Sequence, residues 1–416
     1  MTLDNQEENN MANEPQINYQ TKLFTLNDIF PQGEFNNVLF SHQKPTGLQP
    51  IIKWAGGKEK ELKYILPNIP AFNRYFEPFV GGGAVFFSIQ ANEFFINDLS
   101  DELIALYKNI ASTDKLFFYY ADTINKSWQN ARNFFINNPI LIDIYLDYRK
   151  NILSKEQLKT KIYSFCDSKT HEILNIVGTV FENKPNIILE EMSKNLFRKM
   201  LRMHELELKK QLLPDADLND NIETAIKSAV YMNYRHLYND NMLKTNDEKL
   251  HCALFLFIRN YSYSGMFRYN DDGCFNVPYG GIAYNSKTLT KKLNYYQSTP
   301  LLKHFKYTGI YNLDFETFLR NNNPDKDDFV FLDPPYDSIF NTYAQNEFTR
   351  TDQERLANYM INECKAKWMM VIKNTDFIYN LYNRNGINIR TFDKEYLVSF
   401  MNRNDKKVTH LLITNY

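Results

Sequence analysis

Short apolar runs alternate with segments of helical periodicity near both ends of the 416-residue chain. Towards the N-terminus, RYFE and FFIN are expected to be strands, and DELIALYKNI has the spacing of an amphipathic helix. A glycine triplet follows the first strand, and the chain is expected to leave it as a helix. The same alternation resumes from about residue 304 and continues into VTHLLITNY. This order of elements is typical of a doubly wound α/β fold with a parallel sheet.

The middle of the chain has a different pattern. Residues 111–250 have mostly helical apolar spacing, interrupted by an expected loop at 213–220. Residues 251–262 fit either an apolar helix or a buried strand. The turn-forming sequence Asn-Asp-Asp-Gly at 270–273 then predicts a hairpin or ordered loop within about 260–282.

These patterns predict one domain inserted into another. The sheet domain would comprise residues 49–110 and 303–416, and the inserted helical domain would comprise 111–302. Residues 1–48 are polar and acidic, and we expect a partly disordered extension.

Composition excludes several classes of protein. Hydrophobic residues make up 44% and charged residues 23%, which is typical of globular proteins, and the net charge of -1 gives no indication of partners. No apolar run is long enough for a membrane span, and the N-terminus lacks the features of a signal peptide. Four scattered cysteines and seven histidines show no disulfide framework and no metal-ligand spacing. We therefore expect a cytoplasmic protein without a metal.

The glycine triplet lies in the segment Glu-Pro-Phe-Val-Gly-Gly-Gly, residues 77–83. A dinucleotide site would have a third glycine where Phe86 stands, and a phosphate loop would continue with Lys-Ser/Thr, which is absent. The loop therefore suits a nucleoside-bearing ligand without a pyrophosphate. A tight structural turn is the alternative explanation.

Acidic residues follow two other predicted strands. Asp98 lies where a carboxylate could accept hydrogen bonds from both hydroxyls of a ribose. Asp314 and Phe315 could hold an adenine ring through its amino group and an aromatic edge. An ordinary helix N-cap, with Phe315 in the core, explains either acid as well.

The most specific element is an apolar strand that ends in Asp-Pro-Pro-Tyr, residues 333–336. The two prolines remove two backbone donors, which is costly for a sheet. An exocyclic amine on a base is a poor nucleophile because its lone pair is delocalised into the ring. The Asp333 carboxylate and the Pro334 carbonyl, facing its two N–H groups, would draw the nitrogen towards tetrahedral geometry, and Tyr336 would stack on the base. Catalysis would then come from positioning and preorganised acceptors.

In this order, KWAGGK, FEPFVGGG, IND, DPPY and the RYN…FNVPYG segment resemble the Dam-like, alpha-group DNA adenine-N6 methyltransferases. The resemblance is closest to the DpnM-type methylases of restriction–modification systems. It covers residues 51–107 and 252–345 well. It implies a Rossmann-like, S-adenosylmethionine-dependent methyltransferase sheet with an inserted, mainly helical DNA-recognition domain.

The resemblance also implies roles for single residues. S-adenosylmethionine would be bound by Trp54, Lys58, Glu77, Phe79, Gly81, Gly83, Asp98, Asp314, Phe315 and Asp333. The catalytic residues would be Asp333, Pro334, Pro335 and Tyr336. DNA would be contacted by Lys53, Tyr263, Ser264, Met266, Arg268 and Asn270. Lys53 and Arg268 match residues that reach guanines in relatives that recognise GATC, and such bidentate contacts are common.

Two departures affect the recognition sequence. Ser264 stands where the family usually has asparagine, and Met266 replaces a leucine. Because that asparagine lies in the base-reading hairpin, recognition of GATC is in doubt. The helical block is also longer than in compact relatives.

The expected function is therefore S-adenosylmethionine-dependent methylation of adenine N6 in double-stranded DNA, with the target base flipped out of the duplex. A cognate restriction endonuclease is the expected genetic partner. Three alternatives remain at this point: a cytosine-N4 methyltransferase, an RNA or protein-glutamine methyltransferase, and a DNA-binding module with a vestigial cofactor pocket.

Overall fold

The computed structural model describes residues 46–178, 185–336, 348–395 and 407–416. Nearly all of the expected N-terminal extension lies outside these residues. Among the helices described, none combines the length and apolar character needed to cross a membrane.

A seven-stranded sheet has the order β3-β2-β1-β4-β5-β7-β6. The first five strands in this order pair in parallel, and β7 is antiparallel to both of its neighbours. The strands are β1 (Arg74–Glu77), β2 (Glu93–Asn97), β3 (Thr308–Tyr311), β4 (Phe329–Leu332), β5 (Lys367–Lys373), β6 (Asn388–Glu395) and β7 (Lys407–Thr414). The predicted doubly wound α/β fold is confirmed. Because the strand order reverses between β1 and β4, a ligand is expected at the carboxyl ends of these two strands.

Both faces of the sheet are covered. Successive residues of a strand point to opposite faces, so Tyr75 lies in one hydrophobic cluster and Phe76 in the other, and both are fully buried. Phe331 and Leu332 of β4 divide between the clusters in the same way. Outside the segment between α3 and β3, the described helical elements are α2 (Leu62–Ile65), η2 (Leu66–Asn68), η3 (Phe86–Ser88), α3 (Asp101–Ala111), α14 (Phe315–Asn322), α15 (Arg350–Asn362) and α16 (Asp376–Tyr382).

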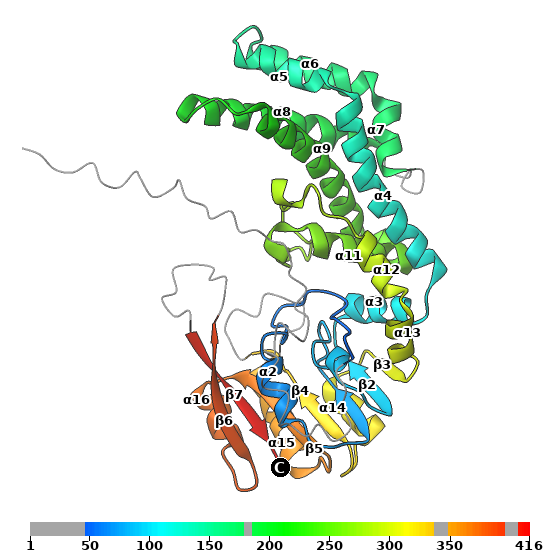
Figure 1. Cartoon of the computed structure of the whole chain (residues 1–416), viewed down its shortest axis with the longest axis vertical. Coiled ribbons are helices and arrows are strands. Elements are labelled where there is room, and N and C mark those ends of the chain that lie inside the picture. Colours follow the sequence, from blue (N-terminus) through cyan, green and yellow to red (C-terminus); the bar gives the residue numbers. More distant parts are fainter. Residues whose placement is uncertain (1–45, 179–184, 337–347, 396–406) are drawn as a thin grey trace, which may run out of the picture.

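The segment between α3 and β3 is mainly helical and extends away from the sheet (Figure 1). Its elements are α4 (Lys115–Asn137), α5 (Ile140–Arg149), α6 (Lys155–Ser168), α7 (Thr170–Val177), α8 (Pro185–Lys209), α9 (Asp215–Tyr238), α10 (Asn241–Asn246), α11 (Glu248–Tyr261), η5 (Tyr263–Gly265), η6 (Ile282–Tyr284), α12 (Thr290–Tyr296) and α13 (Thr299–Phe305). One hydrophobic cluster continues from the sheet into these helices. The division at 110/111 and 302/303 stays a prediction.

Two local predictions are wrong. Most of the loop expected at 213–220 belongs to α9, because Pro214 is the N-cap and Asp215 and Asp217 suit the positive end of the helix. The helix expected after the glycine triplet is only the single turn η3. The glycine loop therefore does not present the N-terminus of a long helix to a ligand. Residues 251–262, left open between helix and strand, lie almost entirely in the helix α11.

Candidate active site

Acidic side chains meet at the carboxyl ends of β1, β2 and β4. Glu77 ends β1 and is buried, and Asp333 directly follows β4. Burial raises the pKa of Glu77 well above its ordinary value, although the Tyr75 hydroxyl donates to its carboxylate at 2.8 Å and opposes the shift. The charge of Asp333 raises the pKa of Glu77 further.

The basic partner in this part of the site is Lys58. Its side chain is buried, and its Nζ donates a hydrogen bond to Asp333 Oδ1. The same Nζ also donates to the Gly56 carbonyl, at a distance of 2.8 Å. The KWAGGK and DPPY motifs, far apart in sequence, therefore meet in an ion pair. No cluster of three or more His, Cys, Asp or Glu side chains within the described ranges is arranged to hold a metal ion.

Asp98 faces the glycine loop. Its two carboxylate oxygens accept hydrogen bonds from the backbone N–H groups of Gly81 and Ser100, both at 3.0 Å. Burial raises the pKa of Asp98, and these two hydrogen bonds oppose the shift. The side chain that caps α3 is Ser100, so Asp98 is not the N-cap. A carboxylate has about four acceptor positions, which leaves capacity for a ligand hydroxyl.

The glycine loop packs directly against the KWAGGK loop. Gly81 and Gly83 have φ values of +49° and +80°, which side chains rarely adopt. A Cβ on Gly81 would lie 2.9 Å from Trp54 Cδ1, and the Gly81 carbonyl accepts a hydrogen bond of 3.0 Å from the Tyr107 hydroxyl. The glycine segment therefore forms the tight turn that was the alternative explanation for it. The turn also brings Trp54 to the edge of the site.

Asp314 and Phe315 begin α14. Asp314 is its N-cap, as the alternative explanation held, because Oδ1 accepts from the N–H groups of Glu316 and Thr317. Phe315 is buried, and its ring centroid lies 5.7 Å from those of both Phe79 and Phe348. Phe79 and Phe348 lie 5.5 Å apart, which completes a triangle of rings beside Asp314. Phe348 was not among the predicted site residues.

Two side chains that were not predicted as site residues contact the Asp-Pro-Pro-Tyr motif. Pro334 is buried, and the Pro335 carbonyl accepts a hydrogen bond of 2.8 Å from the buried Gln353 of α15. The Tyr336 hydroxyl lies 3.1 Å from Nε2 of His410, which is fully buried in β7. Lys58 Nζ lies 5.6 Å from the centre of the Tyr336 ring. No local motif marks Gln353 or His410, since each is brought to the site by the fold.

The predicted DNA-contacting residues divide into two groups. Lys53, Tyr263, Arg268 and Asn270 are exposed, whereas Ser264 and Met266 are half-buried. A Cβ on Gly265 would lie 4.0 Å from Lys53 Cδ, so the KWAGGK loop and the turn at η5 are neighbours.

The predicted hairpin is present as an antiparallel bridge between Tyr269 and Phe275. Within it, Asn270 Oδ1 accepts a hydrogen bond of 2.8 Å from the Cys274 N–H, and Arg268 Nε donates to Asn276 Oδ1 at 2.9 Å. Asn270 therefore closes the turn, which explains its identity without DNA. The Arg268 side chain lies across the exposed face of the hairpin.

Arg259 joins the site to this hairpin and was not foreseen. It donates to the Lys53 carbonyl at 2.7 Å, and its guanidinium lies 5.0 Å from the Trp54 ring and 4.5 Å from the Phe267 ring. Burial lowers the pKa of Arg259 to about 10, so it remains protonated at neutral pH. One buried cation thus connects the Trp54 loop to the base of the hairpin.

The conformation of Ser264 gives a test of its replacement. Its φ of +55° is left-handed, a region in which asparagine is several-fold enriched and serine is not. We expect Ser264→Asn to raise the free energy of unfolding by about 0.5 kcal/mol, and Ser264→Ala to lower it. Urea denaturation of both variants measures this. A loss of stability in Ser264→Asn would contradict it.

The sequence matches the family described as D12 class N6 adenine-specific DNA methyltransferase over residues 54–169 and 176–397. The matched residues include both β1 and β4, with the motifs that follow them.

Curated relatives cover most of the chain. The type II methyltransferase M.CviBI of Paramecium bursaria Chlorella virus NC1A is 27% identical over 380 residues, which span 89% of this chain and 100% of that protein. The type II methyltransferase M.MjaIII of Methanocaldococcus jannaschii is 27% identical over 390 residues, 89% of this chain and 99% of the relative. A DNA adenine methylase of Vibrio cholerae is 21% identical over 369 residues, 87% and 94% of the two chains. The chain belongs to the D12 class of N6 adenine-specific DNA methyltransferases.

Proposed function

We propose that the chain transfers a methyl group from S-adenosylmethionine to adenine N6 at a short defined site in double-stranded DNA, as the modification enzyme of a restriction–modification system. Adenine-specific DNA methylation is the activity of its family. The observation that carries the proposed mechanism is the position of Asp333, at the carboxyl end of β4 beside the strand-order reversal and in an ion pair with Lys58.

The charges of the pocket fit this cofactor. Glu77, Asp98 and Asp333 are close enough that the charge of Asp333 raises the pKa of both Glu77 and Asp98. S-adenosylmethionine has two positive centres, a sulfonium and an ammonium, and one carboxylate. An acidic pocket with a buried lysine suits that combination. Asp98 has remaining acceptor capacity for the ribose, and Asp314 with the Phe79, Phe315 and Phe348 rings suits the adenine.

The chain's own residues would activate the target amine. When bound, S-adenosylmethionine supplies an electrophilic methyl group. Asp333 and the Pro334 carbonyl would accept hydrogen bonds from the adenine amino group and direct its lone pair at that methyl. Gln353 fixes the Pro-Pro segment by bonding the Pro335 carbonyl, and His410 orients the Tyr336 ring on which the flipped base would stack.

Recognition of DNA would fall to the exposed residues around η5 and the hairpin. Lys53 and Arg268 have donors suited to guanine O6 and N7, and the 52% exposed Tyr263 suits the gap left by a flipped base. GATC stays in doubt, because Ser264 replaces the usual asparagine at the η5 turn.

Direct sequencing of modified bases tests the proposal. Purified protein is incubated with unmethylated mixed-sequence DNA and S-adenosylmethionine, and the expected product is N6-methyladenine at one recurring motif. Unmodified DNA would count against the proposed substrate. Methylation scattered without a motif would contradict a defined site.

A further inference from the structure

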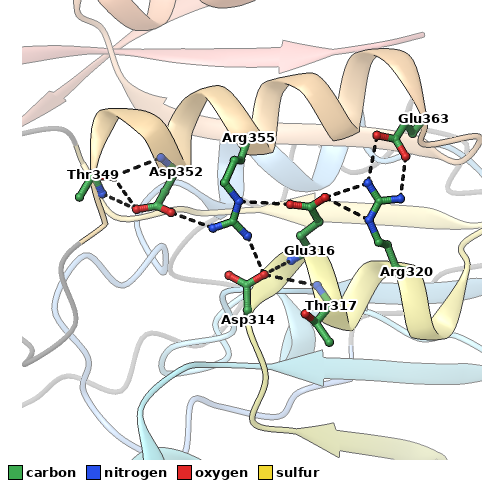
Figure 2. A network of polar contacts seen from close by, with 8 residues as sticks. All are labelled: Asp314, Glu316, Thr317, Arg320, Thr349, Asp352, Arg355 and Glu363. Atoms are coloured by element: carbon green, nitrogen blue, oxygen red, sulfur yellow. Dashed lines mark hydrogen bonds and ion pairs between the residues drawn. The ribbon is translucent and has the colours of Figure 1, made fainter.

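Three carboxylates converge on one guanidinium between α14 and α15. Arg355 Nη2 donates to Asp314 at 2.8 Å, Nη1 donates to Asp352 at 2.9 Å and Nε donates to Glu316 at 3.2 Å (Figure 2). Each nitrogen of Arg355 thus contacts a different acid. Charge-assisted hydrogen bonds of this kind also fix direction, because the donors of a guanidinium lie in one plane.

The contacts to Asp314 all fall on one of its oxygens. Oδ1 accepts from Arg355 and from the Glu316 and Thr317 N–H groups, and Figure 2 shows no contact to the second oxygen. Within the described part of the chain, Oδ2 accepts no hydrogen bond, and the side chain of Asp314 is 41% exposed. An ordinary N-cap needs only the two backbone donors, so Arg355 is additional to the cap.

Arg355 also contacts the aromatic side of the same pocket. Its guanidinium carbon lies 4.9 Å from the centre of the Phe315 ring. Its partner Asp352 forms the capping box of α15 with Thr349, which directly follows Phe348. Arg355 therefore holds the Asp314 carboxylate and contacts the Phe315 ring. Through Asp352 it is also bonded to the first turn of α15, whose N-cap directly follows Phe348.

We infer that Arg355 is a positioning residue for adenine recognition, fixing the Asp314 carboxylate so that Oδ2 accepts a hydrogen bond from the amino group of the cofactor's adenine. The inference rests on the proposed binding of S-adenosylmethionine at this pocket. Without Arg355, Asp314 still caps α14, but its carboxylate is no longer held in one orientation and loses the positive charge beside it. The carboxylate must then be ordered and desolvated when the nucleoside binds.

Arg320 provides a matched control within the same network. It bonds Glu316 at 2.8 Å and Glu363 at 2.7 Å, and so it also connects α14 to α15, but it does not contact Asp314 (Figure 2). Arg355→Met and Arg320→Met each remove one arginine that connects the two helices. A purely structural role predicts similar effects for both.

The test is calorimetric binding of S-adenosylhomocysteine and of its S-inosyl analogue, in which a carbonyl replaces the amino group. Wild type is expected to prefer the adenosyl compound by about 10-fold or more. In Arg355→Met the Kd for the adenosyl compound should rise about 5- to 20-fold while that for the inosyl compound changes less than about 2-fold. Arg320→Met should keep the wild-type preference, and Arg355→Lys, with one cationic donor group, should be intermediate.

The outcomes separate the inference from the proposed function. Equal loss of preference in Arg355→Met and Arg320→Met, or no loss in Arg355→Met, would overturn the role of Arg355. Binding by wild type without preference would also overturn it, while leaving cofactor binding intact. No binding of either compound by wild type would overturn both proposals. Because each preference is a ratio measured on one preparation, a partly unfolded sample changes the stoichiometry and not the ratio.

Discussion

Asp333→Asn is expected to lower kcat for adenine methylation by about 10³-fold, the loss typical when one preorganised hydrogen-bonding group is removed from an active site. The substitution keeps the size of the side chain but replaces one acceptor oxygen with an NH2 donor. That donor would face an amine whose own N–H groups need acceptors. Single-turnover methylation with saturating DNA and S-adenosylmethionine measures the chemical step, and gel-shift binding should show that DNA affinity is retained.

Lys58→Met supplies the control for this result. Both substitutions break the ion pair between Lys58 and Asp333, but only Asp333→Asn removes the acceptor. Lys58→Met should therefore act mainly on the Kd of S-adenosylmethionine and reduce single-turnover rates at saturation much less. Similar rate losses in the two variants would assign the effect to the ion pair and contradict the role proposed for Asp333.

Gly83→Ala is expected to lower the free energy of unfolding by about 2–4 kcal/mol, the sum of a left-handed backbone and an overfilled core. The φ of Gly83 is +80°, and an added Cβ would lie 2.6 Å from the Tyr107 hydroxyl oxygen and 2.7 Å from the Phe87 ring. Tyr107 and Phe87 are both fully buried, so neither can move without disturbing the core. Urea denaturation, followed by tyrosine fluorescence and by circular dichroism, measures the change.

Gly386→Ala separates the two causes. Its φ is +84°, but no atom lies within 4 Å of the position that a Cβ would occupy. It should cost only the backbone part, about 1–2 kcal/mol. If Gly83→Ala were no worse than Gly386→Ala, crowding by Tyr107 and Phe87 would be excluded as a cause.

The parallel part of the fold could be predicted because strands and helices alternate along the chain. Part of the site could be predicted because three of the strands end at an acid with a recognisable chemical role. Glu77, Asp98 and Asp333 mark the ends of β1, β2 and β4, and topology alone brings such ends to one edge of a sheet. The antiparallel insertion of β7 between β5 and β6 has no local signal, because it depends on long-range pairing. His410 lies in no recognisable motif of the sequence, although β7 brings it to Tyr336.

The remaining gaps in the predicted site have the same origin. Gln353, Arg355 and Arg259 are ordinary helix residues in sequence, and their importance comes from what lies opposite them after folding. Asp314 shows the reverse case, since its N-cap role was foreseen and its ion pair was not. Motifs therefore identify the groups proposed to touch the ligand, whereas the groups that orient them become visible only in the structure.

The long helical segment between β2 and β3 has a consequence for synthesis. β1 pairs with β2 on one side and with β4 on the other. The whole helical segment lies between β1 and β4 in the chain. At ribosomal rates of about 5–20 residues per second, β4 is made on the order of ten to fifty seconds after β1. During that interval the nascent chain has an unpaired edge at the centre of its future sheet, and such edges promote aggregation. The helices, with their local contacts, can fold in the meantime, so the yield of enzyme in the cell depends on how well this edge is protected until β4 arrives.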